Sequence, residues 1–338
     1  MAAAAEDRVL TIAAANIDRL TTVEMRRSDY SRGVITHLHA AAVEAQGGTP
    51  LSLAGARLLK EKVVPGRTVL ITTGAGDPRY LPAGETDGPP GAAVLARLVA
   101  ALGGTPILLT EAAFVDNLAA TALGAGLGIR SPELADGTPW TTAVLALSAG
   151  DDAAVQAAEL LDRFNPTLLI SIEKIGPNPA GSAHSASGSP THASRARAEY
   201  LFDLGRERGL PSLGIGDNGN ELGFGKILAA VHEHKPKGET LGTRVETDVL
   251  VPANASNWGA YGIAAALAIL MEQPDLLHSP VDERRMLEAC VDQGAVDGST
   301  GRHIVEVDGM TLAAQEGLLS MLGCIVRNAL IRGYKRPF

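Results

Sequence analysis

Two glycine-rich segments of the chain carry acidic residues of the kind that bind cations. The first reads GIGDNGNELGFGK and places Asp217 and Glu221 in a turn after a β-branched run. The second reads LPAGETDGPPGAAVL and places Glu85 and Asp87 at the start of a predicted helix. Carboxylate oxygens are hard ligands that suit a divalent metal ion, and their charge also suits an ammonium group. The two segments therefore predict a cation site.

The first segment also contains a formal dinucleotide-binding pattern, which we reject on electrostatic grounds. Gly214, Gly216 and Gly219 match GxGxxG after a predicted strand. Asp217 and Glu221 would stand where a pyrophosphate meets backbone N–H groups, and like charges repel. The segment is not a P-loop either, because no Ser or Thr follows its lysine. The structural alternative is a tight turn in which Asp217 caps the next helix.

The second segment has two compatible interpretations. Asp87 would be the N-cap of the following helix, which has prolines in its first turn. Glu85, Thr86 and Asp87 would also lie in a stiff loop over the sheet edge, where free amides at the helix start suit a substrate carboxylate.

A third acidic residue, Glu173, ends the apolar run ISIEK. A glutamate at a strand end near other acids is suited to act as a general base with a raised pKa. The alternative is that Glu173 simply emerges into solvent. Lys174 and Lys226 could bind a carboxylate, or be ordinary surface charges.

Further polar residues could line a pocket. Ser256, Asn257 and Trp258 open an apolar helix, for which Ser256 is a natural N-cap. His184 lies in a loop rich in Ser, Gly, Pro and His (177–194), and such a stretch is typical of an active-site loop or a linker. No HExxH or Cys/His spacing indicates zinc, and no GxSxG motif indicates a serine nucleophile.

The elements that must position these residues follow a repeated order of strand and helix. Six apolar runs predict buried strands, and Ala- and Leu-rich helical patterns lie between them. This order predicts an α/β fold of three layers, in which helices cover both faces of a mostly parallel sheet. The predicted strands are Thr68–Thr73, Pro106–Glu111, Thr141–Leu147, Thr167–Lys174, Pro211–Asp217 and Thr247–Asn254. The predicted helices are Ala92–Leu102, Asp116–Gly126, Asp152–Phe164, His192–Gly209 and Trp258–Met271.

The predicted strands end in polar residues. In an open parallel sheet, ligands bind beyond the carboxyl ends of the strands. We therefore expect Thr73, the adjacent Gly74 and the acidic residues to meet there. The strand-end residues are Thr72, Thr73, Glu111, Glu173, Asp217 and Asn254.

Two terminal regions flank these elements. Residues 1–60 are predicted to form a helical arm or cap, and residues 61–338 an α/β catalytic domain, unless both belong to one continuous domain. Near the C-terminus, His303–Val307 with a VDG turn predicts a hairpin, and Leu312–Arg332 predicts a final helix.

Composition narrows the classes of function. The 338 residues include 38 Asp and Glu against 29 Lys and Arg, a formal charge of −9. This balance argues against nucleic-acid and anionic-membrane binding, which rely on Lys and Arg. Two cysteines and an N-terminus unlike a signal peptide predict a cytoplasmic protein. We expect a small-molecule substrate, and leave a homo-oligomer open.

Several strings occur in a specific order along the chain. They are TTGAGDPRYLPAGETDGPPGA, ISIEK followed by a Gly/Ser loop, GIGDNGNELGFGK and SNWGAYG, flanked by MRRSDYSRGVI at Met25 and by QGAVDGSTG and EVDGM near Gln293 and Glu306. Together they resemble the D-glutamate cyclase family, in its C-terminal-type domain. The resemblance implies a lyase that converts D-glutamate to 5-oxo-D-proline plus water with the help of manganese.

The resemblance also implies roles at matching positions. The acidic positions are Glu85, Asp87, Glu173, Asp217 and Glu221, with Asn220 and Asn257 as polar partners. Two departures stand out. Asn218 replaces an expected glycine, and the loop after Glu173 reads Lys-Ile-Gly and then AHSASG, where the family usually has Arg-Pro-Gly and a string with Tyr and Arg. If that loop contacts the substrate, the protein acts on something other than D-glutamate.

Lactam closure requires a neutral amine to attack a carboxylate, which is a poor electrophile that a Lewis acid would activate. We expect Mn²⁺ or Mg²⁺ on Asp217 and Glu221, with Asp87 or Glu173 completing the shell and Asp87 favoured as the third ligand. Glu173, Asp217 and Glu221 are the predicted catalytic residues, and Glu173 would move the proton. The predicted substrate-binding residues are Thr73, Gly74, Glu85, Thr86, Lys174, His184, Asn220, Ser256, Asn257 and Trp258. The alternatives are a metal-dependent hydrolase or dehydratase-cyclase for another small lactam or amide, and a binding module without chemistry.

Overall fold

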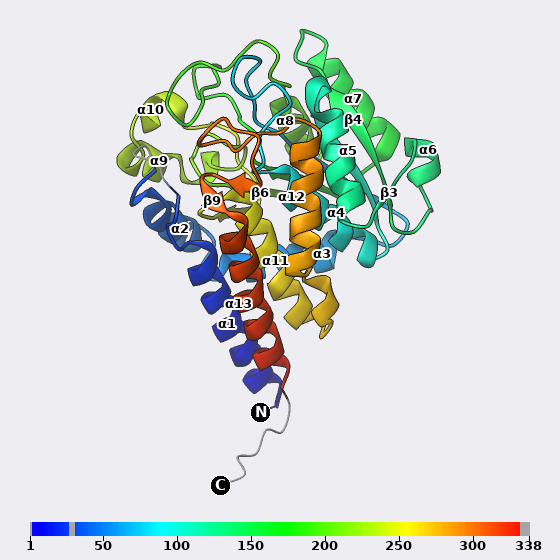
Figure 1. Ribbon diagram of the computed structural model, residues 1–338, viewed down its shortest axis with the longest axis vertical. Coiled ribbons are helices and arrows are strands. Elements are labelled where there is room, and N and C mark those ends of the chain that lie inside the picture. Colours follow the sequence, from blue (N-terminus) through cyan, green and yellow to red (C-terminus); the bar gives the residue numbers. More distant parts are fainter. Residues whose placement is uncertain (1, 27–30, 332–338) are drawn as a thin grey trace.

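The computed structural model of the protein describes residues 2–26 and 31–331, with side chains from residue 7 onward (Figure 1). Its main sheet has seven strands in the order β3-β4-β2-β1-β5-β6-β7, and each neighbouring pair is parallel. The strands are β1 (Thr68–Thr73), β2 (Thr105–Glu111), β3 (Gly128–Ile129), β4 (Thr141–Leu147), β5 (Leu168–Ile172), β6 (Ser212–Gly216) and β7 (Val249–Pro252). All six predicted strands are confirmed. The sequence missed β3, which has two residues and is too short to show a periodic pattern.

Helices cover both faces of this sheet, as a three-layer α/β fold requires (Figure 1). Along β1, Val69 and Ile71 belong to a core shared with α4 (Pro89–Ala101) and α11 (Ser256–Leu270). Leu70 belongs to a core shared with α7 (Ala153–Phe164) and α8 (Glu199–Glu207). Both faces are therefore apolar, which explains why the strands read as continuous buried runs.

The helices carry these two cores. They are α1 (Ala2–Thr21), α2 (Val34–Ala45), α3 (Leu51–Lys62), α4 (Pro89–Ala101), α5 (Val115–Gly124), α6 (Pro132–Ala135), α7 (Ala153–Phe164), α8 (Glu199–Glu207), α9 (Leu228–His234), α10 (Gly238–Leu241), α11 (Ser256–Leu270), α12 (Pro280–Asp292) and α13 (Leu312–Leu330). No helix in the described part of the chain is long and apolar enough to cross a membrane.

Some predicted boundaries are wrong. The helix predicted from His192 begins only at Glu199, because the polar loop continues through Arg195, whose guanidinium is bound by the carbonyl of Ile175 and the carboxylate of Glu199. The C-terminal hairpin pairs β8 (Glu306–Val307) with β9 (Met310–Thr311), slightly later than predicted. The predicted end of the last helix at Arg332 lies outside the described residues.

The first sixty residues form α1, α2 and α3, which pack on the rest of the chain. Helix α3 contacts α11, and α1 runs beside both α11 and α13 (Figure 1). Side chains of α1 and α3 share one apolar core with the sheet. The division into a cap and a catalytic domain at residue 60 stays a prediction.

The strand order creates one position for a ligand site. From β1 the chain moves outward through β2 to β3 and β4, and it then returns to the other side of β1 with β5. The connections after β1 and β5 therefore diverge and leave a crevice at the carboxyl ends of these strands, which is where such sheets bind ligands. The neighbouring strand β6 ends at the same edge.

Gly88 gives the first test of this edge. It has a φ of 105°, and a Cβ there would lie 2.7 Å from Thr73 Oγ1 and 2.9 Å from Glu173 Cβ. We expect Gly88→Ala to lower the free energy of unfolding by about 2–4 kcal/mol, through backbone strain and steric overlap. Gly126→Ala is the matched control, because Gly126 has a φ of 88° but no atom within 4 Å of its added Cβ. Urea unfolding of both variants measures the difference, and equal losses would contradict the close approach at Gly88.

Candidate active site

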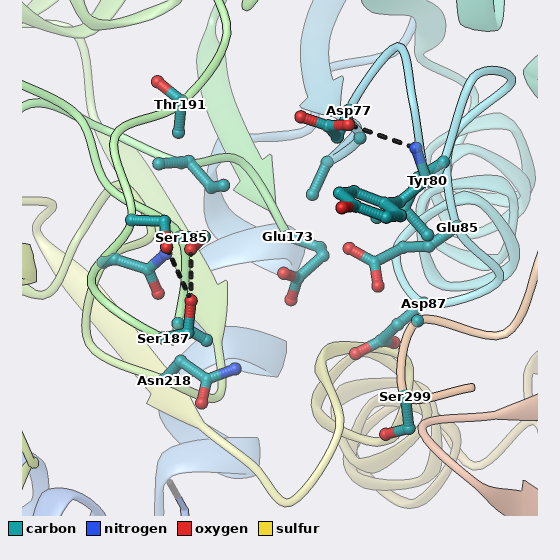
Figure 2. A pocket seen from close by; sticks show the side chains of 18 of the residues that line it. Asp77, Tyr80, Glu85, Asp87, Glu173, Ser185, Ser187, Thr191, Asn218 and Ser299 are labelled. Atoms are coloured by element: carbon teal, nitrogen blue, oxygen red, sulfur yellow. Dashed lines mark hydrogen bonds between the residues drawn. The ribbon is translucent and has the colours of Figure 1, made fainter. Parts of the chain in front are cut away.

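A cavity of about 590 Å³ opens at the carboxyl ends of β1, β5 and β6 (Figure 2). One wall carries Asp77, Tyr80 and Glu85, and the opposite wall carries Ser187 and Thr191 of the polar loop. The sequence predicted that the loop at residues 177–194 would belong to an active site, and the loop does line this cavity through its second half.

Three buried carboxylates converge at the base of the cavity. Asp87, Glu173 and Asp217 each offer one oxygen, and these oxygens all lie within 4.8 Å of one another. The three residues follow β1, β5 and β6, which are adjacent in the sheet. Three carboxylates this close repel each other unless protons or a cation neutralise them.

Asp87 is held by the backbone of another helix. Its carboxylate accepts hydrogen bonds from the N–H groups of Ser256 (2.8 Å) and Asn257 (2.8 Å) at the start of α11, and from Gly88 (3.1 Å). The prediction that Asp87 caps its own helix is therefore wrong: the N-cap of α4 is Gly88, and Asp87 satisfies α11 instead. Burial raises the pKa of Asp87 well above its usual value, as do Asp308 and Asp217, while the backbone hydrogen bonds oppose the rise.

Asn257 makes the matching contacts at the start of α4. Its Oδ1 accepts hydrogen bonds from the N–H groups of Gly88 (3.0 Å) and Gly91 (2.8 Å), and its Nδ2 donates to the Thr86 carbonyl (3.0 Å). Asn257 thus accepts hydrogen bonds from free N–H groups at the start of α4, while Asp87 accepts them at the start of α11. The two helices that carry the floor of the site cap each other.

Glu173 occupies an unusual backbone position directly after β5. Its φ is 45°, the left-handed region that costs a residue with a side chain about 1–2 kcal/mol. Ser256 donates its hydroxyl to Glu173 Oε2, so this serine binds a site carboxylate and is not the N-cap of α11, which is Ala255. Burial raises the pKa of Glu173 well above its usual value, and Asp217 and Glu221 add to the rise.

Asp217 bonds with a guanidinium from the N-terminal segment. Arg26 Nη1 contacts Asp217 Oδ2, and the same nitrogen lies 3.1 Å from Asp308 Oδ2. Burial raises the pKa of Asp217 to about 7 and that of Asp308 to about 7, although Arg26 lowers both. Asp217 does not cap a following helix, so that structural alternative is wrong.

Glu85 and Asp308 complete the acidic lining. Burial raises the pKa of Glu85 well above its usual value, and the nearby charges of Asp308 and Asp87 add to it. Asp308 also has a left-handed φ, 52°. With Asp77, Asp87, Glu173 and Asp217, they make six acidic residues in the cavity lining. Among the described residues of that lining, Arg26 is the single Lys or Arg.

Glu221 lies apart from the converging trio. Its two oxygens accept hydrogen bonds from the N–H groups of Asn218 (3.0 Å) and Gly219 (2.8 Å), and this closes the acidic turn. Glu173, rather than Glu221, therefore joins Asp87 and Asp217 in the geometric cluster. The difference arises because a glutamate two or three residues after a turn can bind the turn's own amides.

Lys174 does not reach the cavity. Its ammonium is fully buried in an ion pair with Glu111 and donates to the Gly74 carbonyl (3.3 Å). Gly74 has a φ of 119°, and a Cβ there would lie 2.6 Å from Thr110 Oγ1. Burial lowers the pKa of Lys174, which Glu111 opposes. Lys174 and Gly74 thus contact each other in the interior and do not line the cavity. The interpretation of Lys174 as a surface charge is wrong.

Other predicted residues are buried in structural contacts. The Thr86 hydroxyl donates to the Glu306 carbonyl (2.6 Å), and Trp258 Nε1 donates to Gln315 (2.6 Å). His184 offers its backbone carbonyl to Asn220. Thr73 is buried beside Gly88, and its hydroxyl has no partner in the described structure.

Comparison of the sequence with known proteins identifies the family of this chain. Residues 28–323 match the family model described as D-glutamate cyclase-like, C-terminal. The chain belongs to this D-glutamate cyclase-like family. It is also similar to a human protein named D-glutamate cyclase, mitochondrial, with 29% identity over 280 residues. The match covers 72% of this chain and 43% of the human protein, so the chain spans less than half of that relative.

Family membership confirms the resemblance seen in the motifs, but sequence reasoning missed several residues of the D-glutamate cyclase-like site. Arg26 and Asp308 lie in the MRRSDYSRGVI and EVDGM strings, which marked the family without suggesting a role. Lys235 also went unnoticed; its ammonium donates to Asn218 Oδ1 (2.7 Å) and to the hydroxyl of Ser31 (3.1 Å). The cytoplasmic location and the homo-oligomer stay predictions.

The raised pKa values predict how stability depends on pH in this D-glutamate cyclase-like domain. From about pH 4 to about pH 7, the unfolded chain loses protons that Asp217 and Asp308 keep when folded. The folded state then binds more protons, so its stability must fall as the pH rises. We expect the free energy of unfolding, with chelator present, to fall by about 2–4 kcal/mol from pH 5 to pH 7.5.

Asp308→Asn should reduce this fall, because it removes one titrating group and also the charge that raises the pKa of Glu85. Asparagine is a suitable replacement, because it tolerates the left-handed backbone at this position. Urea unfolding at both pH values gives the slope for each protein. A variant with the same slope as the wild type would show that Asp308 does not titrate in this range, and a wild type without any slope would show the same for both residues.

Proposed function

We propose that the protein is an enzyme that closes D-glutamate to 5-oxo-D-proline and water with the help of Mn²⁺ or Mg²⁺. The observation that supports this most is the convergence of Asp87, Glu173 and Asp217 within 4.8 Å on a cavity, in a chain of the D-glutamate cyclase-like family. In the reaction an N–C bond forms and a C–O bond breaks. Two protons leave the ammonium group and end on the departing oxygen as water, so atoms and charge balance.

The donor set fits a hard divalent cation. All three carboxylates are buried, and burial together with neighbouring acidic charge raises their pKa values. The positive charge near them, that of Arg26 beside Asp217, therefore compensates their ionised forms only in part. Hard oxygen ligands suit Mn²⁺ and Mg²⁺. When bound, such an ion would act as a Lewis acid on the reacting carboxylate.

The remaining side chains can bind substrate and move protons. Arg26 is suited to hold the carboxylate of the substrate that does not react, because a guanidinium binds carboxylates through paired N–H groups. Glu85 lines the cavity and forms no side-chain hydrogen bond within the described residues. A carboxyl group with a raised pKa can accept a proton from the ammonium and return it to the leaving oxygen. We therefore assign proton transfer to Glu85 and metal binding to Glu173.

The main test is turnover. The protein would be incubated with D-glutamate, L-glutamate and both 5-oxoprolines, with Mn²⁺ or with chelator, and products followed by chromatography. We expect Mn²⁺-dependent loss of D-glutamate, and at least a hundredfold lower kcat/KM for Asp217→Asn. Turnover that persists in chelator would overturn the metal role, and an unreacted panel would overturn the substrate assignment.

A pair of variants separates the two roles of the glutamates. Glu85→Gln should lower kcat by about a hundredfold or more while it changes Mn²⁺ affinity by less than about threefold. Glu173→Gln should weaken Mn²⁺ binding by about tenfold or more, because it removes a charged ligand. Calorimetry with Mn²⁺ and steady-state kinetics measure both, and reversed results would exchange the two assignments.

The polar loop favours a second candidate. Ser185, Ser187, Thr191 and His192 line the cavity where a family string with Tyr and Arg was expected. A wall of hydroxyl groups suits a neutral amide or lactam better than a second carboxylate. The alternative proposal is metal-dependent opening of another small lactam or amide, which the same assay tests when the panel includes neutral lactams.

A further inference from the structure

Asn220 lies in the acidic turn after β6. Its side-chain oxygen is one of two buried polar atoms of the cavity lining that have no partner among the described residues, and the other is Nε of Arg26. Asn220 is 2% exposed and lines the cavity. Its Nδ2 donates to the carbonyl of His184 (2.8 Å), and its own backbone carbonyl accepts from the N–H of Gly176 (2.8 Å). These two bonds attach the turn to the polar loop and to the chain after β5, so the side chain has one fixed position.

The bond to His184 also fixes which end of the amide is free. A backbone carbonyl can only accept, so the NH₂ group of Asn220 must face it and the oxygen must face away. Asn220 Oδ1 is buried and has no hydrogen-bond partner in the described part of the chain. The neighbouring Asn218 differs, because its Oδ1 accepts from both Ser31 and Lys235. Buried acceptors are normally paired, and no described residue donates to Asn220 Oδ1, so we expect a ligand to supply the donor.

The surrounding charge indicates what that donor is. Asp217 and Glu173 line the same cavity, and their carboxylates repel an anion and attract a cation with N–H groups. We propose that Asn220 Oδ1 accepts a hydrogen bond from the amino nitrogen of the substrate and thereby selects amino acids over the corresponding dicarboxylic acids. This inference rests on the proposed function for its choice of amino acid.

The chemistry of the reaction fits a single acceptor. The nitrogen carries three protons as ammonium, two as the attacking amine and one in the lactam, so it always has one N–H to donate. A bond from that N–H to Asn220 would leave the lone pair of the amine free to face the carboxylate. Asn220 would therefore hold the same nitrogen in substrate and product.

Two substitutions isolate the oxygen. Asn220→Ala and Asn220→Asp both remove the NH₂ group that binds the loop, but only Asn220→Asp keeps an acceptor oxygen. Asn178 is the matched control, because its Nδ2 also donates to a carbonyl, that of Thr240, whereas its Oδ1 already accepts from Ala180 and Ser182 and lies outside the cavity lining. Thermal unfolding verifies that each variant is folded.

The probes are D-glutamate and glutarate, which differ only in the amino group, with the Mn²⁺-loaded protein. Where D-glutamate is turned over, its KM is compared with the inhibition constant of glutarate; where it is not, D-glutamate is stable and both affinities come from calorimetry. We expect the wild type and Asn178→Ala to prefer D-glutamate by about tenfold. Asn220→Ala should lose this preference with little change for glutarate, and Asn220→Asp should retain it.

The outcomes separate this inference from the proposed function. A preference that depends on the Asn220 oxygen supports the inference even when D-glutamate is not converted. Equal weakening of both ligands in Asn220→Ala and Asn220→Asp would mean that Asn220 only anchors the loop, and would overturn it. A wild-type protein without preference for D-glutamate over glutarate overturns it without any variant.

Discussion

Repulsion among buried carboxylates at one edge of the sheet is the constraint on which the rest of the site depends. Asp87, Glu173 and Asp217 follow three adjacent strands, whose carboxyl ends meet at one edge of the sheet, and one oxygen of each lies within 4.8 Å of the others. Like charges at this separation in a buried place cannot all remain ionised without compensation. The chain supplies part of that compensation through Arg26 and through the N–H groups at the start of α11. The pKa of Asp217 still rises to about 7, so the compensation within the chain is incomplete.

The mutual capping of α4 and α11 shows how the fold keeps these acids in place. A helix start has unpaired N–H groups and a partial positive charge. At the start of α11, the Asp87 carboxylate accepts hydrogen bonds from two of these N–H groups and compensates the charge. At the start of α4, the N–H groups of Gly88 and Gly91 donate to the side-chain amide of Asn257. This amide is neutral and adds no further negative charge. Ser256, the first residue of α11, donates its hydroxyl to Glu173. The Asp87 carboxylate cannot move in this arrangement without breaking hydrogen bonds at the start of α11, so its position is fixed by the fold itself.

The sequence predicts the sheet, its buried strands and the edge where the site lies, because these depend on local hydrophobic runs and on general rules of parallel sheets. It does not predict which acids converge. Glu173 and Glu221 lie in different motif strings and both look suited to the site, and only the structure shows that Glu221 binds the amides of its own turn. Lys174 looks like a surface charge until the burial of its Glu111 partner is known. Arg26 and Asp308 come from opposite ends of the chain, and no local pattern connects them.

The backbone of the site is also strained at two acidic residues. Glu173 and Asp308 both have left-handed φ values, although neither is glycine. Such strain persists only where the surroundings hold it, and it gathers at functional sites. Here it coincides with buried carboxylates whose pKa values are raised, so two separate costs to stability fall on the same residues. A fold selected for stability alone would replace these acids with neutral side chains. Their presence is explained if a divalent cation and an amino group neutralise them, and the cost of burying them is then offset when ligands bind.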